Sequence, residues 1–503
     1  MMLEKQLDRT LALLEKHKEN PAHLEKHYDS ILETLMQGLR APPPSNTDKL
    51  IELIEAFDPW PLRWHKHIAW LGILDQGIAL AIEHKSFHHL FQFWYSRAKI
   101  FFFSGQFENA QESIEQAIQI ATAHHFSEEL LNAHILEYDI IGFSEQGKSQ
   151  KELWPLLEIL LDEQKKHLRP MAHASLKGQM LLRKGNLIRF QGHHDKALAI
   201  MQNGFDLIME NASDDLALLA RTYKYRASLN EELGNYSQSI ADNKIMNAYF
   251  NLLGDRFSEI DSLGDLGLIY WRTGKYIEAE EILQRSIQMA EETKAQWWLV
   301  RQLGNQGLVQ FTRGNLSTAA ALIKRQKKLS QLTGNIPEEK RAISNGAFVK
   351  LFQGQTKEAT HDLLENLGYI KERKYHIAEG LVYANLAWSL EEQKEATEYA
   401  EEALKIAESM NSPRLKIIAL RALAELKNEP QEKQKIAQEA LELAKKHNRF
   451  LNQAGALLSL ATCTSNAQTV SLQEEATCIL QSLGAENWIN VENSSNQRLP
   501  LLL

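Results

Sequence analysis

The sequence predicts an all-α fold: a right-handed α-solenoid of antiparallel helical hairpins with an N-terminal helical cap. A glycine recurs every 40 residues, at Gly234, Gly274, Gly314 and Gly354, within stretches such as LGNYSQSI and TGKYIEAE. Each glycine lies between two runs whose apolar residues are spaced three and four apart, as on one helix face. The composition, with 44% apolar residues, 24% charged residues and 12 prolines, fits one continuous folded body.

The copy around Gly274 shows how one unit is built. Its apolar stripes are Leu263, Leu266 and Tyr270 on the first helix and Tyr276, Ala279, Leu283 and Ile287 on the second. We expect Gly267 and Ala279 to let the two helices approach closely. We expect Gly274 to end the first helix in a left-handed conformation without Cβ strain. Each copy is therefore predicted to be one helical hairpin.

The repeat extends in both directions with lower fidelity. Toward the N-terminus the turn glycines are Gly105, Gly147 and Gly192. Toward the C-terminus they give way to Leu-Ala pairs 37 residues apart, at Leu386/Ala387, Leu423/Ala424 and Leu460/Ala461, followed by second-helix alanines such as Ala396, Ala400 and Ala403. We therefore expect an N-terminal helical domain or cap at 1–89, a repeat array at 90–485 and a C-terminal tail at 486–503.

This layout resembles the tetratricopeptide repeat superfamily, in the longer-period variety seen in bacterial regulators such as the maltose regulator and in kinesin light chains. The resemblance covers roughly residues 90–485. The positions that match the family pattern best are Leu266, Gly267, Tyr270, Gly274, Tyr276, Ala279 and Leu283. Other copies depart from it, with Gln306 in place of Leu, Ser239 in place of Ala and Thr356 in place of an aromatic residue.

The first 89 residues lack the repeat. Residues 3–18 and 22–39 are predicted to form two amphipathic helices separated at Asn20-Pro21, and the loop RAPPPSNTD ends in a candidate helix cap at Thr47 or Asp48. An aromatic-rich stretch follows, with Trp60, Trp64, Trp70, Phe87, Phe91, Phe93, Trp94 and Phe101. It is either a packed cap over the end of the array or an exposed patch that docks a partner.

Composition disfavours several classes of function. A net charge of −9 disfavours nucleic acid as a partner, because phosphate binding needs clustered Lys and Arg. The charged N-terminus and the lack of a long apolar stretch predict a cytoplasmic protein without membrane contact. Cys463 and Cys478 cannot build a disulfide framework or a four-cysteine zinc site. No cofactor is expected.

Catalytic and metal-binding motifs are weak. GFSEQGKS, from Gly142 to Ser149, fits the phosphate-loop pattern, but that motif needs a preceding strand, whereas Gly147 also fits the repeat as a turn glycine. The histidine pairs His23/His27 and His84/His88 supply only two of the ligands that zinc requires. Since nothing nominates a nucleophile, we expect a protein that is not an enzyme.

The inner face of the array can be read from the first helices in steps of 40 residues. One row is Asp265, Asn305, Asn345 and Asn385; a second is Arg221, Asp261, Arg301, Arg341 and Leu381; a third is Leu268, Leu308, Phe348 and Trp388. The resemblance implies that asparagines in such positions hold the backbone of an extended peptide, to which a carboxamide offers both a donor and an acceptor. The predicted binding residues are Arg221, Asp261, Asp265, Arg301, Asn305, Arg341, Asn345, Phe348, Asn385 and Trp388.

Structural roles for the same residues remain open. The asparagines can bond neighbouring helices, the third row can pack between first helices, and the arginines can form intramolecular ion pairs. We expect a non-catalytic scaffold or sensor that binds a peptide or protein in the concave face. The alternative is a regulatory, peptide-responsive protein whose N-terminal helical domain is the output element. The oligomeric state stays open.

Overall fold

The computed structural model describes residues 2–18, 20–40, 46–64, 66–143, 150–464 and 466–489, and the regular structure in these ranges is entirely helical. The N-terminal helices are α1 (Met2–His17), α2 (Pro21–Lys26), α3 (Tyr28–Arg40), α4 (Thr47–Phe57), α5 (Pro59–Arg63) and α6 (His67–Glu83). The first helices of the hairpins are α7 (Phe87–Phe103), α9 (Ser127–Phe143), α11 (Pro170–Phe190), α13 (Leu216–Glu232), α15 (Arg256–Arg272), α17 (Gln296–Thr312), α19 (Ile336–Phe352), α21 (His376–Ser389), α23 (Pro413–Leu426) and α25 (Phe450–Ala461). The second helices are α8 (Phe107–Ala123), α10 (Gln150–Gln164), α12 (His194–Asn211), α14 (Tyr236–Leu252), α16 (Tyr276–Glu292), α18 (Leu316–Thr333), α20 (Thr356–Glu372), α22 (Gln393–Ser409), α24 (Pro430–Lys446) and α26 (Asn466–Ser482), followed by the 3-10 helix η1 (Glu486–Trp488).

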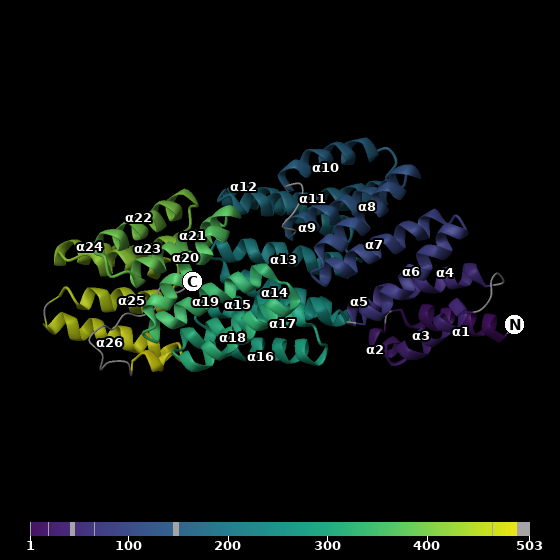
Figure 1. The fold of residues 1–503 in the computed structure, drawn as a ribbon. Coiled ribbons are helices and arrows are strands. Elements are labelled where there is room, and N and C mark those ends of the chain that lie inside the picture. Colours follow the sequence, from purple (N-terminus) through teal and green to yellow (C-terminus); the bar gives the residue numbers. More distant parts are fainter. Residues whose placement is uncertain are drawn as a thin grey trace.

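From α7 onward, consecutive helices pack in pairs, and each pair stacks on the next (Figure 1). The second helix of one hairpin packs on the first helix of the following hairpin, as α16 does on α17. First helices also pack directly on one another, as α15 does on α17 and α17 on α19. The fold is therefore an all-α solenoid of helical hairpins, as the sequence predicts.

The small residues act as the repeat pattern predicts. Gly234, Gly274, Gly314 and Gly354 have φ angles of 80°, 80°, 80° and 78°, a left-handed conformation that side chains rarely adopt. A Cβ atom placed on Gly267 would lie 2.5 Å from Cγ of Leu283 in the paired helix. Close contact between the two helices of this hairpin thus depends on a residue without a side chain.

The N-terminal helices differ in detail from the prediction. The expected helix at 22–39 is interrupted at His27, where α2 ends and α3 begins. The predicted cap at Thr47 or Asp48 is wrong by at least one position, because Asn46 precedes the first helical residue of α4 and Thr47 is already helical and buried. The Asn46 side chain makes no capping hydrogen bond.

The aromatic stretch is mostly packed inside the protein. Its buried members are Trp60, Trp64, Trp70, Phe91, Phe93 and Phe101. Trp70 also donates a hydrogen bond from Nε1 to Oδ1 of Asp58 at 2.8 Å. Phe87 is 39% exposed and stacks on His124. This packing favours the cap over an exposed aromatic patch.

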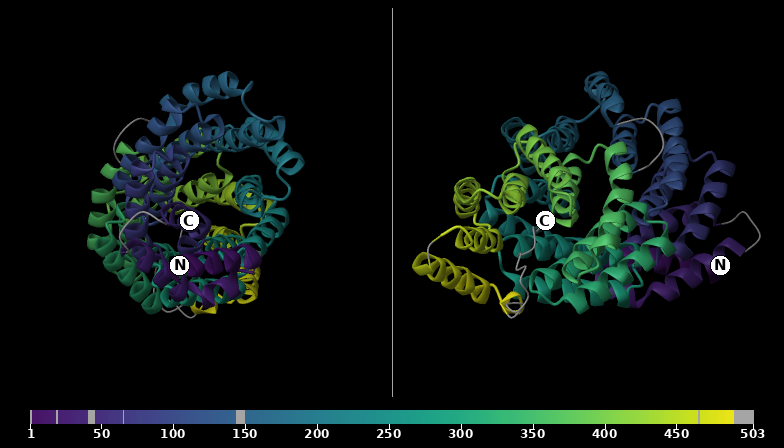
Figure 2. Two further views of the ribbon diagram at one scale, coloured as in Figure 1. Left: turned by 90° about the vertical axis from the view of Figure 1, so that its right-hand side faces the viewer. Right: turned by 60° about the vertical axis from the view of Figure 1, so that its left-hand side comes forward.

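The superhelix brings distant segments together (Figure 2). Near its start, α5 contacts α15, and Nη2 of Arg256 pairs with Oε2 of Glu25 at 2.7 Å. Near its end, Nε1 of Trp488 in η1 donates to the carbonyl of Thr312 at 2.7 Å. Of the predicted tail, residues 490–503 lie outside the described residues. These contacts hold both ends of the solenoid against its middle repeats.

Candidate peptide-binding surface

The first helices form the inner layer of the solenoid. Every position of α17 from Leu299 to Thr312 except Arg301 is buried, whereas α18 buries only Ala319, Ile323, Gln326 and Ser330. The first helices also contact one another directly, as expected for the inner, shorter circumference of a curved stack. In the left view of Figure 2 the helices form a ring around the long axis of the molecule. Side chains that project from the inner layer therefore face the axis.

Charged residues of three successive first helices meet on this inner face. Arg301 of α17 donates from Nη1 to Oδ1 of Asp261 at 2.5 Å and from Nη2 to Oδ1 of Asp265 at 2.7 Å. Lys224 of α13 pairs with Asp261 as well, and its Nζ lies 3.4 Å from Oδ2 of Asp265. Arg221, one turn before Lys224, is exposed. The 40-residue step thus brings Asp261 and Arg301 together, in the intramolecular ion pair that the sequence left open.

Burial and neighbouring charges shift the pKa values of Asp261 and Arg301 in opposite directions. Burial alone would raise the pKa of Asp261, but Lys224 and Arg301 lower it below the usual value for aspartate. Burial would likewise lower the pKa of Arg301, but the carboxylates of Asp265 and Asp261 raise it above its ordinary range. Asp261 and Arg301 are therefore both charged at neutral pH.

Arg341 covers the first asparagine of the row. Its Nη2 donates a hydrogen bond to Oδ1 of Asn305, and its Nη1 lies 3.3 Å from Oε1 of Glu338. Asn305 is only 1% exposed, and its Nδ2 contacts Oε1 of Gln302 at 3.4 Å. In the structure described, Asn305 therefore bonds a neighbouring first helix.

The other two asparagines are also buried. Asn385 is 2% exposed and donates from Nδ2 to the carbonyl of Leu381 at 2.8 Å, within its own helix. Asn345 is 3% exposed, and its Nδ2 has no hydrogen-bond partner among the described residues. A buried donor without a partner is costly, so Asn345 differs from its two counterparts in having an unused donor.

The apolar row packs largely within the array. Phe348 is buried in the main hydrophobic cluster, and Leu268 packs against the same cluster. Trp388 is half-buried, with its ring 6.3 Å from that of Phe352. Of this row, Trp388 keeps the most accessible aromatic surface.

Several residues of the inner face lie outside the predicted set. Lys224 lies 37 residues before Asp261, so a strict 40-residue step misses it. Arg183 of α11 binds Asp139 of α9 through two hydrogen bonds, of 2.8 and 2.5 Å. Arg421 of α23 continues the second row one step beyond Leu381 but is buried, donates to Asn452 and has its pKa lowered by burial to about 10.

We call the charged residues that project from successive first helices the inner charged row. Its members are Asp139, Arg183, Arg221, Lys224, Asp261, Asp265, Arg301 and Arg341. Positive and negative groups are both present in it, and the described ion pairs join α9 to α11, α13 to α15 and α15 to α17.

In the residues that it describes, the structure gives no support to the phosphate-loop pattern or to a metal site. Gly142 lies in α9, so a helix and not a strand precedes the phosphate-loop pattern, whose residues 144–149 lie outside the described residues. Within the described ranges, no three His, Cys, Asp or Glu side chains are grouped so that they could hold a metal ion. No helix in those ranges is long and apolar enough to cross a membrane.

Comparison with known proteins supports the repeat assignment. Tetratricopeptide repeat models match residues 91–124 and 260–293. No curated protein sequence matches the chain significantly. Among solved structures, a Rap protein complexed with competence and sporulation factor matches with a TM-score of 0.51 and 12% identity, over 73% of this chain and 98% of that chain. The apo quorum sensor NprR from B. thuringiensis matches with a TM-score of 0.47 and 15% identity, over 69% of this chain and 98% of that one.

These likenesses concern the fold. The Rap match covers almost the whole of that protein, and the two matched sequence segments fall on the hairpins α7/α8 and α15/α16. The hairpin stacking, the turn glycines and the two model matches agree. Tetratricopeptide repeats are therefore present at residues 91–124 and 260–293, within an all-α solenoid of stacked helical hairpins.

Proposed function

We propose that this chain is a non-catalytic sensor that binds a peptide or protein segment along the inner charged row. The observation that carries the proposal is the recurrence of charged and amide side chains on successive first helices, from α9 to α19. A surface that repeats at each hairpin suits an extended segment, whose own groups also repeat along its length. The Rap protein that shares this fold is complexed with competence and sporulation factor, which supports a ligand-binding role for a superhelix of this kind.

The inner charged row contains cationic side chains that are accessible to a ligand. The side chains of Lys224 and Arg301 are 39% and 30% exposed although both form ion pairs. A ligand carboxylate can exchange with Asp261 or Asp265 as the partner of either cation, because such charge-assisted bonds are similar in strength. The site therefore favours a segment with acidic side chains or a free carboxylate.

The asparagines require a rearrangement before they can bind a ligand. Arg341 covers Asn305, so this arginine must move before the carboxamide can meet a peptide group. The unused Nδ2 donor of Asn345 supports a contact with a ligand carbonyl once the surrounding side chains move. Asn385 already donates a hydrogen bond to its own helix, so it is the least available of the three asparagines for a ligand. Trp388 is the candidate apolar contact, and the buried Phe348 would support the surface from beneath.

A library of immobilised peptides tests this proposal. The wild-type chain should select acidic sequences, and both Arg301→Ala and Asn345→Ala should weaken binding of the selected peptides at least tenfold. Arg325→Ala is the matched control, because Arg325 pairs with Glu291 on the outer layer, where both side chains are about half exposed. If no peptide is selected, or if both inner variants bind as the wild type does, the inner charged row is not the binding surface.

A second candidate function is regulatory, with residues 1–89 as the output element. It is favoured by the contact between α5 and α15, the helix that carries Asp261 and Asp265. The ring of Phe257, one turn before Asp261, lies 5.4 Å from that of His67. A ligand that shifts α15 would therefore disturb the N-terminal contact. Hydrogen exchange of α2 and α5 should then change when a selected peptide binds, whereas a passive scaffold would show no change there.

A further inference from the structure

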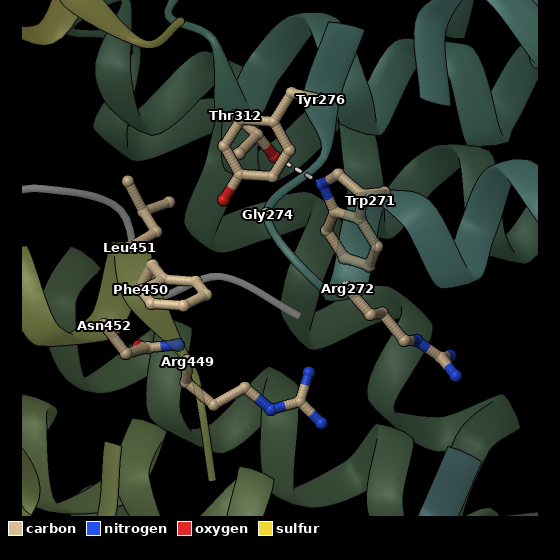
Figure 3. A pocket seen from close by; sticks show the side chains of 9 residues that line it. All are labelled: Trp271, Arg272, Gly274, Tyr276, Thr312, Arg449, Phe450, Leu451 and Asn452. Atoms are coloured by element: carbon tan, nitrogen blue, oxygen red, sulfur yellow. Dashed lines mark hydrogen bonds between the residues drawn. The ribbon is translucent and has the colours of Figure 1, made fainter. Parts of the chain in front are cut away.

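A small pocket lies where the turn between α15 and α16 faces the start of α25 (Figure 3). Its lining residues are Trp271, Arg272, Gly274, Tyr276, Thr312, Arg449, Phe450, Leu451 and Asn452. Segments almost 180 residues apart meet here, so the pocket exists only because successive turns of the superhelix touch. The pocket lies beside the inner charged row: Arg272 ends the helix in which Asp261 and Asp265 lie near the middle, and Arg341 of the row is near enough to repel Arg272.

Two arginines dominate one side of the pocket. Arg272 and Arg449 come from opposite walls, and their side chains extend to the same side (Figure 3). Arg272 forms an ion pair with Glu231. Arg449 has no carboxylate partner among the described residues, and its buried Nε makes no hydrogen bond there. Its guanidinium instead lies over the ring of Tyr236, 5.5 Å from the centroid.

Several arginines lie near the pocket and repel the guanidinium of Arg272. Burial, together with repulsion from nearby cations, brings the pKa of Arg272 well below its ordinary value; these cations are Arg414, Arg449, Arg341 and Arg189. Burial also lowers the pKa of Arg449. Bringing buried cations together costs free energy unless an anion joins them.

Helix dipoles add partial positive charge near these arginines. Arg449 is the N-cap of α25, and Arg414 lies in the first turn of α23. The amino end of a helix carries partial positive charge and disfavours cations. An anion beside Arg449 would be attracted by the guanidinium groups and by the start of α25 together.

We infer that this pocket binds an oxyanion, either a carboxylate or a phosphate, between the guanidinium groups of Arg449 and Arg272. A guanidinium donates two parallel hydrogen bonds to either group. Trp271, Tyr276 and Phe450 also line the pocket and offer apolar ring surface beside the cations; Trp271 and Tyr276 are buried, whereas Phe450 is 38% exposed. The inference does not depend on peptide binding along the inner charged row.

Isothermal titration of the full chain at low salt tests the inference with two probes, inorganic phosphate and the capped dipeptide acetyl-Glu-Glu-amide. Both are too small to span the inner charged row, so failure here leaves the peptide proposal unaffected. We expect the wild type to bind at least one probe, with affinity falling as salt rises. Arg449→Met should weaken that binding at least tenfold, and Arg449→Gln provides a second variant of similar size. Arg325→Met is the control for loss of an arginine elsewhere.

The two probes distinguish a phosphate site from a carboxylate site. Where the Arg449 variants lose the binding, binding of phosphate alone assigns the pocket to phosphate groups, binding of the dipeptide alone assigns it to carboxylates, and binding of both supports the shared chemistry. The inference is overturned if folded wild-type protein binds neither probe. It is equally overturned if both Arg449 variants, folded by circular dichroism, bind as tightly as the wild type.

Discussion

Arg341 donates a hydrogen bond to Oδ1 of Asn305, 36 residues earlier in the chain and on the preceding first helix. Because Asn305 is 1% exposed, this bond satisfies a carboxamide that water hardly reaches. It joins α17 to α19 and at the same time covers the amide that a peptide would need. The contact joins two repeats of the array, and under the proposed mode of binding it would have to break before a peptide could use this carboxamide.

A double-mutant cycle measures this bond. Arg341→Ala and Asn305→Ala should show a coupling energy of about 1.5–3 kcal/mol in urea unfolding, since a hydrogen bond to a charged group contributes roughly that much. The exposed pair Arg325 and Glu291 is the control, with an expected coupling below about 0.5 kcal/mol. Equal coupling in the two cycles would show that burial adds nothing to the Arg341 contact.

Asp261 should make stability depend on pH. Its folded-state pKa is lowered, with burial opposed by the larger effect of Lys224 and Arg301, so it contributes stability that is present above the unfolded pKa of about 3.9 and is lost as pH falls through the folded pKa. Asp261→Asn should destabilise the protein by about 1–3 kcal/mol at pH 7.

The difference between wild type and Asp261→Asn is the quantity to follow. Urea midpoints should differ by a constant amount between pH 5 and 7, begin to converge below about pH 4, and meet only below the lowered folded-state pKa of Asp261, where the wild-type carboxyl is protonated and resembles the amide. Asp195→Asn gives a reference for general acid effects, because Asp195 lies on the outer helix α12 and has no ion pair among the described residues. A difference that persists unchanged to the acid limit would contradict the assignment.

Trp488 should hold the C-terminal segment onto the array. Its ring is 6% exposed, lies 5.3 Å from that of Phe352 and donates to the carbonyl of Thr312. Trp488→Ala should lower the free energy of local opening at the end of α26 by about 3 kcal/mol, measured by hydrogen exchange. Val470→Ala, in α26 itself, removes an exposed side chain and should change little. Similar exchange in both variants would show that the ring is not the main attachment.

The sequence predicts the contacts and turns that involve equivalent positions of successive repeats. The step of 40 residues brings Arg301 to Asp261 because equivalent positions of stacked first helices face the same side. It also predicts the turn conformations, since the glycine at each turn keeps the same φ. The repeat does not predict Lys224, because it lies one helical turn after the repeated position, which Arg221 occupies. Lys224 reaches Asp261 on the next first helix through its long side chain.

Contacts between superhelical turns could not be predicted in the same way. Trp488 and Thr312 are 176 residues apart, and Arg449 faces Arg272 across nearly the same interval. Their meeting depends on the pitch of the superhelix, which sums small rotations at every hairpin and leaves no periodic signal in the sequence. The burial of the asparagines has the same origin, because the tightness of the curve decides how far neighbouring side chains cover them.

Gly267 offers a direct test of the hairpin packing. A Cβ there would lie 2.5 Å from Leu283 Cγ, so Gly267→Ala should force the two helices of this hairpin apart and destabilise the array by about 1–3 kcal/mol. Gly368→Ala is the matched control, since α20 has open space at that position and alanine favours helix over glycine by up to about 1 kcal/mol. Opposite signs for the two changes in thermal midpoint are expected. If Gly267→Ala also raises the midpoint, helix propensity outweighs packing in this repeat and the close approach is not needed for stability.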